Sequence, residues 1–141
     1  MTRICFIIFL VTLWTFSLSA DIYAQKNQEE QIQKAAESWM PLWDIGKYEE
    51  SYELLAQDTR DKISKRQWFV YWTGVRKPLG ALKSRKLKKA EYIKSLPSMP
   101  NQEGALLQYE SSFEKNESVL EIFAMMREKD GTWRVANYLS N

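Results

Sequence analysis

The spacing of hydrophobic positions changes along the chain, from a helical period to a strand period. Apolar residues recur at helical spacing in three successive segments, so this part of the chain predicts three helices, at residues 29–45, 48–55 and 64–78. Pro41 lies inside the first helix and predicts a kink or break near Met40, and Gly46 is placed to cap its end. Ser64 and Gln67 have the spacing of a capping box at the start of the third helix.

After Pro78 the apolar and polar residues alternate, which is typical of half-buried strands. The alternation predicts four strands, at residues 85–94, 105–114, 119–126 and 133–139. Asp130 and Gly131 are typical of a two-residue hairpin turn between the last two strands. Because helices precede strands, we predict an α+β fold in which three N-terminal helices pack on a curved four-stranded antiparallel sheet.

Tight turns at residues 115–116 and 130–131 would fix the register of this sheet, although a shift of one residue would exchange its faces. The face predicted to pack on the helices holds Leu107, Tyr109, Phe113, Leu120, Ile122, Ala124, Met126, Trp133, Val135 and Leu139. The opposite face holds Gln108, Glu110, Ser112, Glu121, Phe123, Met125, Ala136 and Tyr138. This second face mixes polar and apolar groups, as a wet surface or a subunit interface does.

The amino terminus has the organisation of an export signal. Arg3 precedes an uncharged apolar run at residues 4–18, and small residues offer cleavage after Ala24 or Ala20. We therefore predict a signal peptide at residues 1–24, a single α+β domain at residues 25–141, and a periplasmic or secreted location. The alternative is an uncleaved membrane anchor, although the run is shorter than the about 20 residues of a membrane span.

The composition excludes several kinds of chemistry. The chain has no histidine, and its one cysteine, Cys5, lies in the predicted signal, so it has no Ser-His-Asp triad, Cys-His pair or ordinary zinc site. The widely spaced glycines exclude a phosphate-binding loop, so we expect no cofactor and no metal. The net charge of +2 favours no particular partner. Without disulfides, the stability of an exported domain depends on apolar packing.

Several motifs resemble a known family. They include Trp39-x-x-x-Trp43-x-x-Gly46, Arg76-x-Pro78-Leu79-Gly80, Ser84-Arg85-Lys86-Leu87, Tyr109-x-Ser111-Ser112-Phe113 and Asp130-Gly131-x-Trp133-Arg134-Val135. Over nearly all of residues 25–141 the chain resembles the bacterial domain-of-unknown-function family numbered 4019. The resemblance implies an exported domain of the nuclear-transport-factor-2-like shape, also described as cystatin-like. It implies no established activity and no catalytic residues.

Three arginines within these motifs, Arg76, Arg85 and Arg134, are candidate binding residues, because a guanidinium can grip a carboxylate with two hydrogen bonds. They would bind an anionic ligand or pair internally with Glu110 and Glu121, which the assumed register makes neighbours. A set of aromatic residues would either line a pocket or form the core. That set is Trp39, Trp68, Trp72, Tyr109 and Trp133, of which Tyr109 is a candidate binding residue.

The basic run at residues 83–89 has two interpretations: contact with an anionic partner, or an edge strand protected by lysines. Export argues against nucleic acid as that partner.

The first functional hypothesis is a non-enzymatic exported domain that binds a small molecule or a protein, with a homodimer through the mixed sheet face as one form. The second is an enzyme with an apolar cone-shaped pocket, in which Glu110, Glu121 and Tyr138 form the acid-base set. The predicted helix-facing side of the sheet has almost no ionisable group, which favours the first. A purely structural module is a third interpretation.

Overall fold

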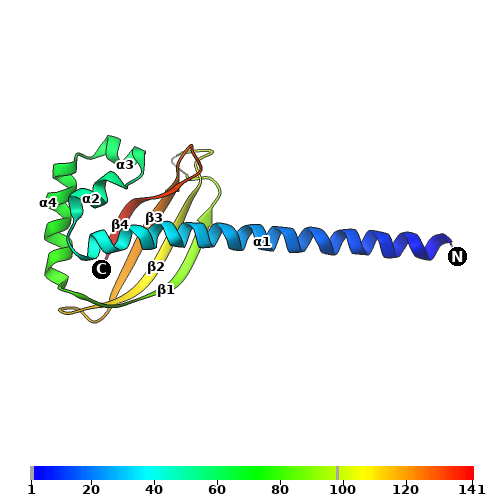
Figure 1. Ribbon diagram of the computed structural model, residues 1–141, viewed down its shortest axis with the longest axis horizontal. Helices are drawn as coiled ribbons and strands as arrows, with labels where there is room; N and C mark the ends of the chain where they lie inside the picture. The colour runs from blue at the N-terminus through cyan, green and yellow to red at the C-terminus, as the bar shows by residue number, and fades with distance from the viewer. Residues whose placement is uncertain (1, 98) are drawn as a thin grey trace. The chain divides into compact units, whose positions relative to one another are not determined.

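The computed structural model describes residues 2–97 and 99–141, with side chains from residue 22 onward, and the chain divides into two units, Met1–Gln31 and Ile32–Asn141. The helices are α1 (Thr2–Asp44), α2 (Tyr48–Glu53), α3 (Gln57–Lys62) and α4 (Lys65–Arg76), followed by the 3-10 helix η1 (Lys77–Leu79). The strands are β1 (Leu82–Ile93), β2 (Gly104–Phe113), β3 (Val119–Arg127) and β4 (Trp133–Ser140). The predicted α+β fold, with helices packed on a four-stranded antiparallel sheet, is confirmed (Figure 1).

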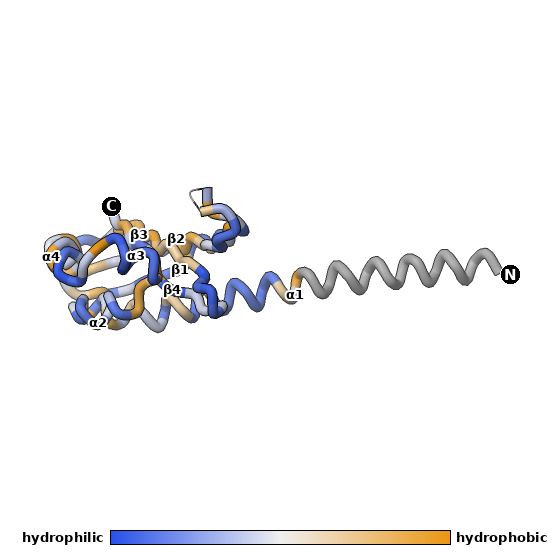
Figure 2. Tube along the Cα trace, turned by 90° about the horizontal axis from the view of Figure 1, so that it is seen from above, coloured by the Kyte–Doolittle hydropathy of each residue, from blue (hydrophilic) through white to orange (hydrophobic). Residues whose placement is uncertain are grey.

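The first unit is helical throughout its described residues, and its residues 25–31 are polar (Figure 2). The apolar run of the predicted export signal lies outside the described side chains, so the signal and its cleavage position stay predictions. Among the residues that the structure describes, no helix is both long and apolar enough to cross a membrane.

Helix α1 continues through Pro41 to Asp44, so of the predicted kink or break near Met40 the break is wrong. Pro41 is exposed, and the buried side chains on either side of it, Met40 and Trp43, keep this last turn packed against the core. Gly46 then ends the helix as predicted, with a φ of 78°. The Gly46 amide donates to the Trp43 carbonyl and the Lys47 amide to the Leu42 carbonyl, the two bonds of a Schellman motif.

The capping box at Ser64 and Gln67 is confirmed at the start of α4. Trp68 and Trp72 of this helix are buried, whereas Tyr71 is 62% exposed. The sequence pattern missed α3, a short helix with no buried residue and therefore no apolar periodicity.

The strand order is β1-β2-β3-β4, and the observed register differs from the predicted one. Ser111 pairs with Val119 and Tyr109 with Glu121, because residues 114–118 form a longer connection than the assumed tight turn. This shift of one residue turns Glu121, Phe123 and Met125 toward the helices, where they are at most 2% exposed. The predicted assignment of β3 to the two faces is therefore wrong, whereas that of Leu107, Tyr109 and Phe113 on β2 holds.

The β3–β4 hairpin also differs from the prediction. The Gly131 amide donates to the Glu128 carbonyl and the Glu128 amide to the Thr132 carbonyl, so the loop has three residues, with Gly131 at positive φ. Farther along, Met125 pairs with Val135 but Ala124 with Asn137, which leaves one extra residue in β4. This bulge buries Tyr138 and leaves Leu139 56% exposed, the reverse of the prediction.

The space between the helices and the sheet is filled by aromatic side chains. The Trp43 ring lies at its centre, 5.3 Å from Trp39, 5.0 Å from Trp72 and 4.8 Å from Tyr138 between ring centroids. Trp39 donates to the Ser51 carbonyl at 2.9 Å, and Trp68 donates to the Ser51 hydroxyl at 3.1 Å. These tryptophans therefore form the core, in agreement with one of the two interpretations of the sequence.

Candidate functional site

Four ionisable side chains meet where α1 and α4 end beside the sheet. Arg85 of β1 is the centre of this charged cluster, which also contains Asp44 from the end of α1, Arg76 from the end of α4 and Glu121 from β3. The Arg85 guanidinium donates to both oxygens of Glu121, at 2.7 and 3.0 Å, and to both oxygens of Asp44, at 2.7 and 2.9 Å. The cluster joins two helix ends to two strands.

Glu121 is fully buried, and both of its carboxylate oxygens are occupied. Besides the two bonds from Arg85, one oxygen accepts a hydrogen bond from the Ser111 hydroxyl and the other accepts one from the Tyr138 hydroxyl at 2.7 Å. A buried carboxylate is costly unless it is paired and hydrogen-bonded, and this one has both forms of compensation. Each carboxylate oxygen of Glu121 therefore already accepts two hydrogen bonds.

The buried groups around Glu121 keep their protons firmly. Burial alone would lower the pKa of Arg85, but its hydrogen bonds and charge interactions with Asp44 and Glu121 outweigh this effect and raise the pKa. Burial and the negative charge of Glu121 raise the pKa of Tyr138 well above its ordinary value. Tyr138 is thus a hydrogen-bond donor throughout the range of physiological pH. Burial also raises the pKa of Tyr109 to about 12.

The structure brings together four of the residues singled out in the sequence: Arg76, Arg85, Glu121 and Tyr138. Glu110, in contrast, is exposed and pairs with Lys88 at 2.9 Å, so the predicted contact between Glu110 and Glu121 is wrong. The register shift of one residue is the reason, because it places the two glutamates on opposite faces of the sheet.

Arg134 lies apart from the charged cluster, whereas Tyr109 is opposite Glu121 in the β2–β3 ladder but its hydroxyl makes no hydrogen bond to the cluster. Arg134 is opposite Met126 in the β3–β4 ladder, where its charge acts on Asp130. Tyr109 is 4% exposed inside the core, and its hydroxyl has no hydrogen-bond partner among the described residues.

Sequence reasoning missed two members of the site, Asp44 and Ser111. Asp44 looks like an ordinary polar residue at the end of a helix, and its pairing with Arg85 joins positions far apart in the chain. Ser111 belongs to the motif Tyr109-x-Ser111-Ser112-Phe113 and lies on the same buried face of β2 as Tyr109 and Phe113, which was the available signal. The expectation that the helix-facing side has almost no ionisable group is wrong, since Glu121 and Arg85 lie there.

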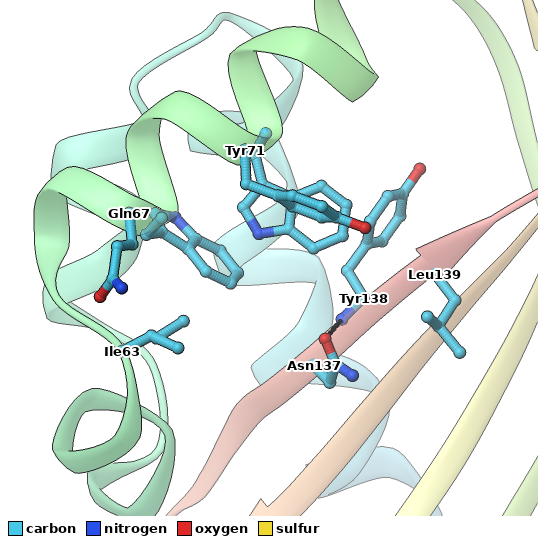
Figure 3. Close-up of a pocket in the computed structure, with 8 residues that line it drawn as sticks. Ile63, Gln67, Tyr71, Asn137, Tyr138 and Leu139 are labelled. Carbon is cyan, nitrogen blue, oxygen red and sulfur yellow. Dashed lines mark hydrogen bonds between the residues drawn. The ribbon is translucent and has the colours of Figure 1, made fainter.

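An open pocket of about 360 Å³ lies between α4 and β4, and we refer to it as the aromatic pocket (Figure 3). Gln67 and Tyr71 reach it from α4, whereas Asn137, Tyr138 and Leu139 reach it from β4. Its full lining is Ile63, Gln67, Trp68, Tyr71, Trp72, Asn137, Tyr138 and Leu139. Tyr138 therefore belongs to both features: its ring lines the pocket and its hydroxyl binds Glu121. Among the described residues, no group of three or more acidic, cysteine or histidine side chains could hold a metal ion.

The fold and the site define a small α+β domain with a charged cluster buried beside an aromatic core. The chain belongs to the family DUF4019, described as a protein of unknown function, whose sequence model matches residues 35–138. The resemblance seen in the motifs is thereby confirmed. Every member of the charged cluster falls within the matched residues.

Comparison with solved structures supports the fold alone. A protein from Catenulispora acidiphila, whose structure has a resolution of 2.5 Å, gives a TM-score of 0.53 at 12% sequence identity. The similarity covers 84% of this chain and 94% of that chain. No curated protein matches this chain.

Proposed function

We propose that this protein is a non-enzymatic binding domain, exported from the cytoplasm, that takes a small and mainly apolar molecule in the aromatic pocket. The observation that carries the proposal is the pocket itself, an open space of about 360 Å³ bordered by four large aromatic side chains. A volume of this size lies within the range of small-molecule sites, which run from about 300 to 1,000 Å³. Export is supported by Arg3 and the apolar run that follows it.

The lining indicates the chemistry of the ligand. Tyr71, which is 62% exposed, provides the main ring surface, and the buried Trp68 and Trp72 rings border the pocket behind it. The Tyr71 and Trp72 rings are perpendicular at 4.6 Å between centroids. Such surfaces favour a flat ring, through offset or edge-to-face contacts. The amides of Gln67 and Asn137 supply a small number of polar positions that would orient one hydrogen-bonding group of the ligand. We therefore expect a monocyclic or bicyclic aromatic molecule.

The state of the acid-base groups supports binding over catalysis. Glu121 has both oxygens engaged by Arg85, Ser111 and Tyr138, so neither is available to a substrate. Tyr138 directs its hydroxyl to Glu121, and its pKa is raised by burial first and by that carboxylate second. A general acid or base needs a pKa near the working pH and access to the reacting atom. The alternative enzyme, with Glu110, Glu121 and Tyr138 as its acid-base set, is disfavoured on both grounds.

The test is a titration of the protein with indole and naphthalene, followed by tryptophan fluorescence and by NMR chemical shifts. Tyr71→Ala should weaken binding by about tenfold, since loss of one ring contact with its buried area is worth about 1–2 kcal/mol. Tyr71 is 62% exposed, so its removal should leave the fold intact.

The matched control is Val70→Ala, because Val70 is the adjacent residue, is 63% exposed and does not line the pocket. Equal affinity in the two variants, or shifts that spare the pocket residues, would refute the proposal.

A further inference from the structure

A second pocket lies on the other side of α4 and shares no lining residue with the aromatic pocket. It has a volume of about 440 Å³ and is open to solvent where α1 ends and η1 begins. We refer to it as the Arg76 pocket. Its lining is Asp44, Ile45, Gly46, Tyr48, Phe69, Thr73, Arg76, Lys77, Gly80 and Ala81.

Arg76 is only 3% exposed, yet its guanidinium has few close partners. One nitrogen donates to the Gly80 carbonyl at 2.6 Å, but the other reaches Asp44 only at 3.5 Å. The Nε group has no partner among the described residues, and the guanidinium lies over the Phe113 ring at 4.5 Å. A buried cation needs an anion in close contact to offset the loss of hydration.

Asp44 does not supply that close contact. Both carboxylate oxygens of Asp44 accept hydrogen bonds from Arg85, at 2.7 and 2.9 Å. Its contact with Arg76 is therefore a second, longer one, at 3.5 Å. Within the cluster, Asp44 and Glu121 balance Arg76 and Arg85, and Lys77 at the pocket adds one further positive charge. Glu114 and Lys115, which lie against Gly80, bring one charge of each sign. The balance at the pocket therefore favours an anion.

The rest of the lining is divided by polarity. The Thr73 hydroxyl is buried without a hydrogen-bond partner among the described residues, and it lies on α4 one turn before Arg76. Ile45 and Phe69 are apolar and are 67% and 41% exposed. Polar donors are thus available beside apolar surface, which is the arrangement that an amphipathic acid requires.

We propose that the Arg76 pocket binds the carboxylate of a small aliphatic acid. The carboxylate accepts hydrogen bonds from Arg76 and a charge contact from Lys77, and the aliphatic chain packs on Phe69 and Ile45. A guanidinium is suited to this role because its planar fork matches the two oxygens of a carboxylate. This site is independent of the proposed aromatic-ligand site.

The experiment is calorimetric titration of the full chain with butyrate, 1-butanol, acetate and inorganic phosphate. Butyrate should bind, 1-butanol should not because it lacks the charge, and acetate should bind more weakly because it lacks the aliphatic chain. Lys77→Ala should weaken butyrate binding several-fold, whereas the control Lys83→Ala, an exposed lysine outside the pocket, should not.

Arg76→Lys keeps the positive charge but removes the fork, so it should weaken butyrate binding at least about tenfold, or about 1.4 kcal/mol. If Arg76→Lys is unfolded by its tryptophan fluorescence, the comparison of Lys77→Ala with Lys83→Ala decides. Tyr71→Ala should leave butyrate binding unchanged, which separates this site from the aromatic pocket. Absence of butyrate binding, equal effects of the two lysine variants, or phosphate binding as tight as that of butyrate would overturn the proposal.

Discussion

Removal of the positive charge of Arg85 should be among the most damaging single changes in this domain. In Arg85→Met the side chain keeps a similar length, but Glu121 loses two charge-assisted hydrogen bonds, at 2.7 and 3.0 Å, and remains fully buried. Asp44 loses bonds of 2.7 and 2.9 Å, although its side chain is 17% exposed and can be hydrated. Most of the cost therefore arises at Glu121.

Leaving one partner of a buried ion pair uncompensated costs about 3–5 kcal/mol. A domain of this size has a free energy of unfolding of about 5–15 kcal/mol, so Arg85→Met should lose a large part of it. The assay is urea unfolding followed by tryptophan fluorescence, with the slope compared between variants to exclude a change in the unfolded state.

The matched control is Lys88→Met on the same strand. Lys88 is paired with Glu110 at 2.9 Å, but the side chains are 50% and 60% exposed, so loss of this pair should change the free energy of unfolding far less than Arg85→Met does. Addition of Glu121→Gln to Arg85→Met should recover part of the loss, because the amide is neutral and can still accept from Tyr138. Equal stability of Arg85→Met and Lys88→Met would show that the buried ion pairs of Arg85 do not stabilise the domain.

Two further predictions concern single residues. Burial raises the pKa of Tyr109 from 10.0 to about 12, so the folded state holds this proton more tightly than the unfolded state; the resulting stability is complete below about pH 10 and is lost as the pH rises through about 12. Tyr109→Phe should therefore reduce the slope of stability between these pH values by up to about 1.4 kcal/mol per unit in urea unfolding, and an unchanged slope would contradict this. Pro41→Ala should stabilise the helix by up to about 3 kcal/mol and therefore raise the melting temperature, because Pro41 is exposed inside a helix. A lower melting temperature would show that the proline is required there.

The elements of the fold were predictable because their signals are local. The helical spacing of Trp39 and Trp43, the glycine at position 46 and the pair Ser64 and Gln67 each act through neighbours in the chain, and each predicted the observed structure. Helix α3 was not predicted, because a short helix without buried residues has no periodic pattern of apolar positions. The effect of Pro41 was misjudged because the packing of the adjacent Met40 and Trp43 outweighed a local preference.

The candidate site was predictable only in its residue types. Arg76, Arg85, Glu121 and Tyr138 were singled out, but their partners depended on the sheet register, and the register depended on loop lengths that the alternation of residues does not specify.

By itself, the sequence determined the α+β class, the family, the absence of histidine chemistry and an amino terminus with the pattern of an export signal. Tertiary structure alone decided that Glu121 faces the helices and that Asp44 and Glu121 share one guanidinium. It also decided that pockets lie on both sides of α4. The physical reason is that the periodicity of the sequence fixes which residues of a strand share a face. The length of a connection sets the register, and a change of one residue turns every side chain of the strand to the other face, which determines the charges that meet in the interior.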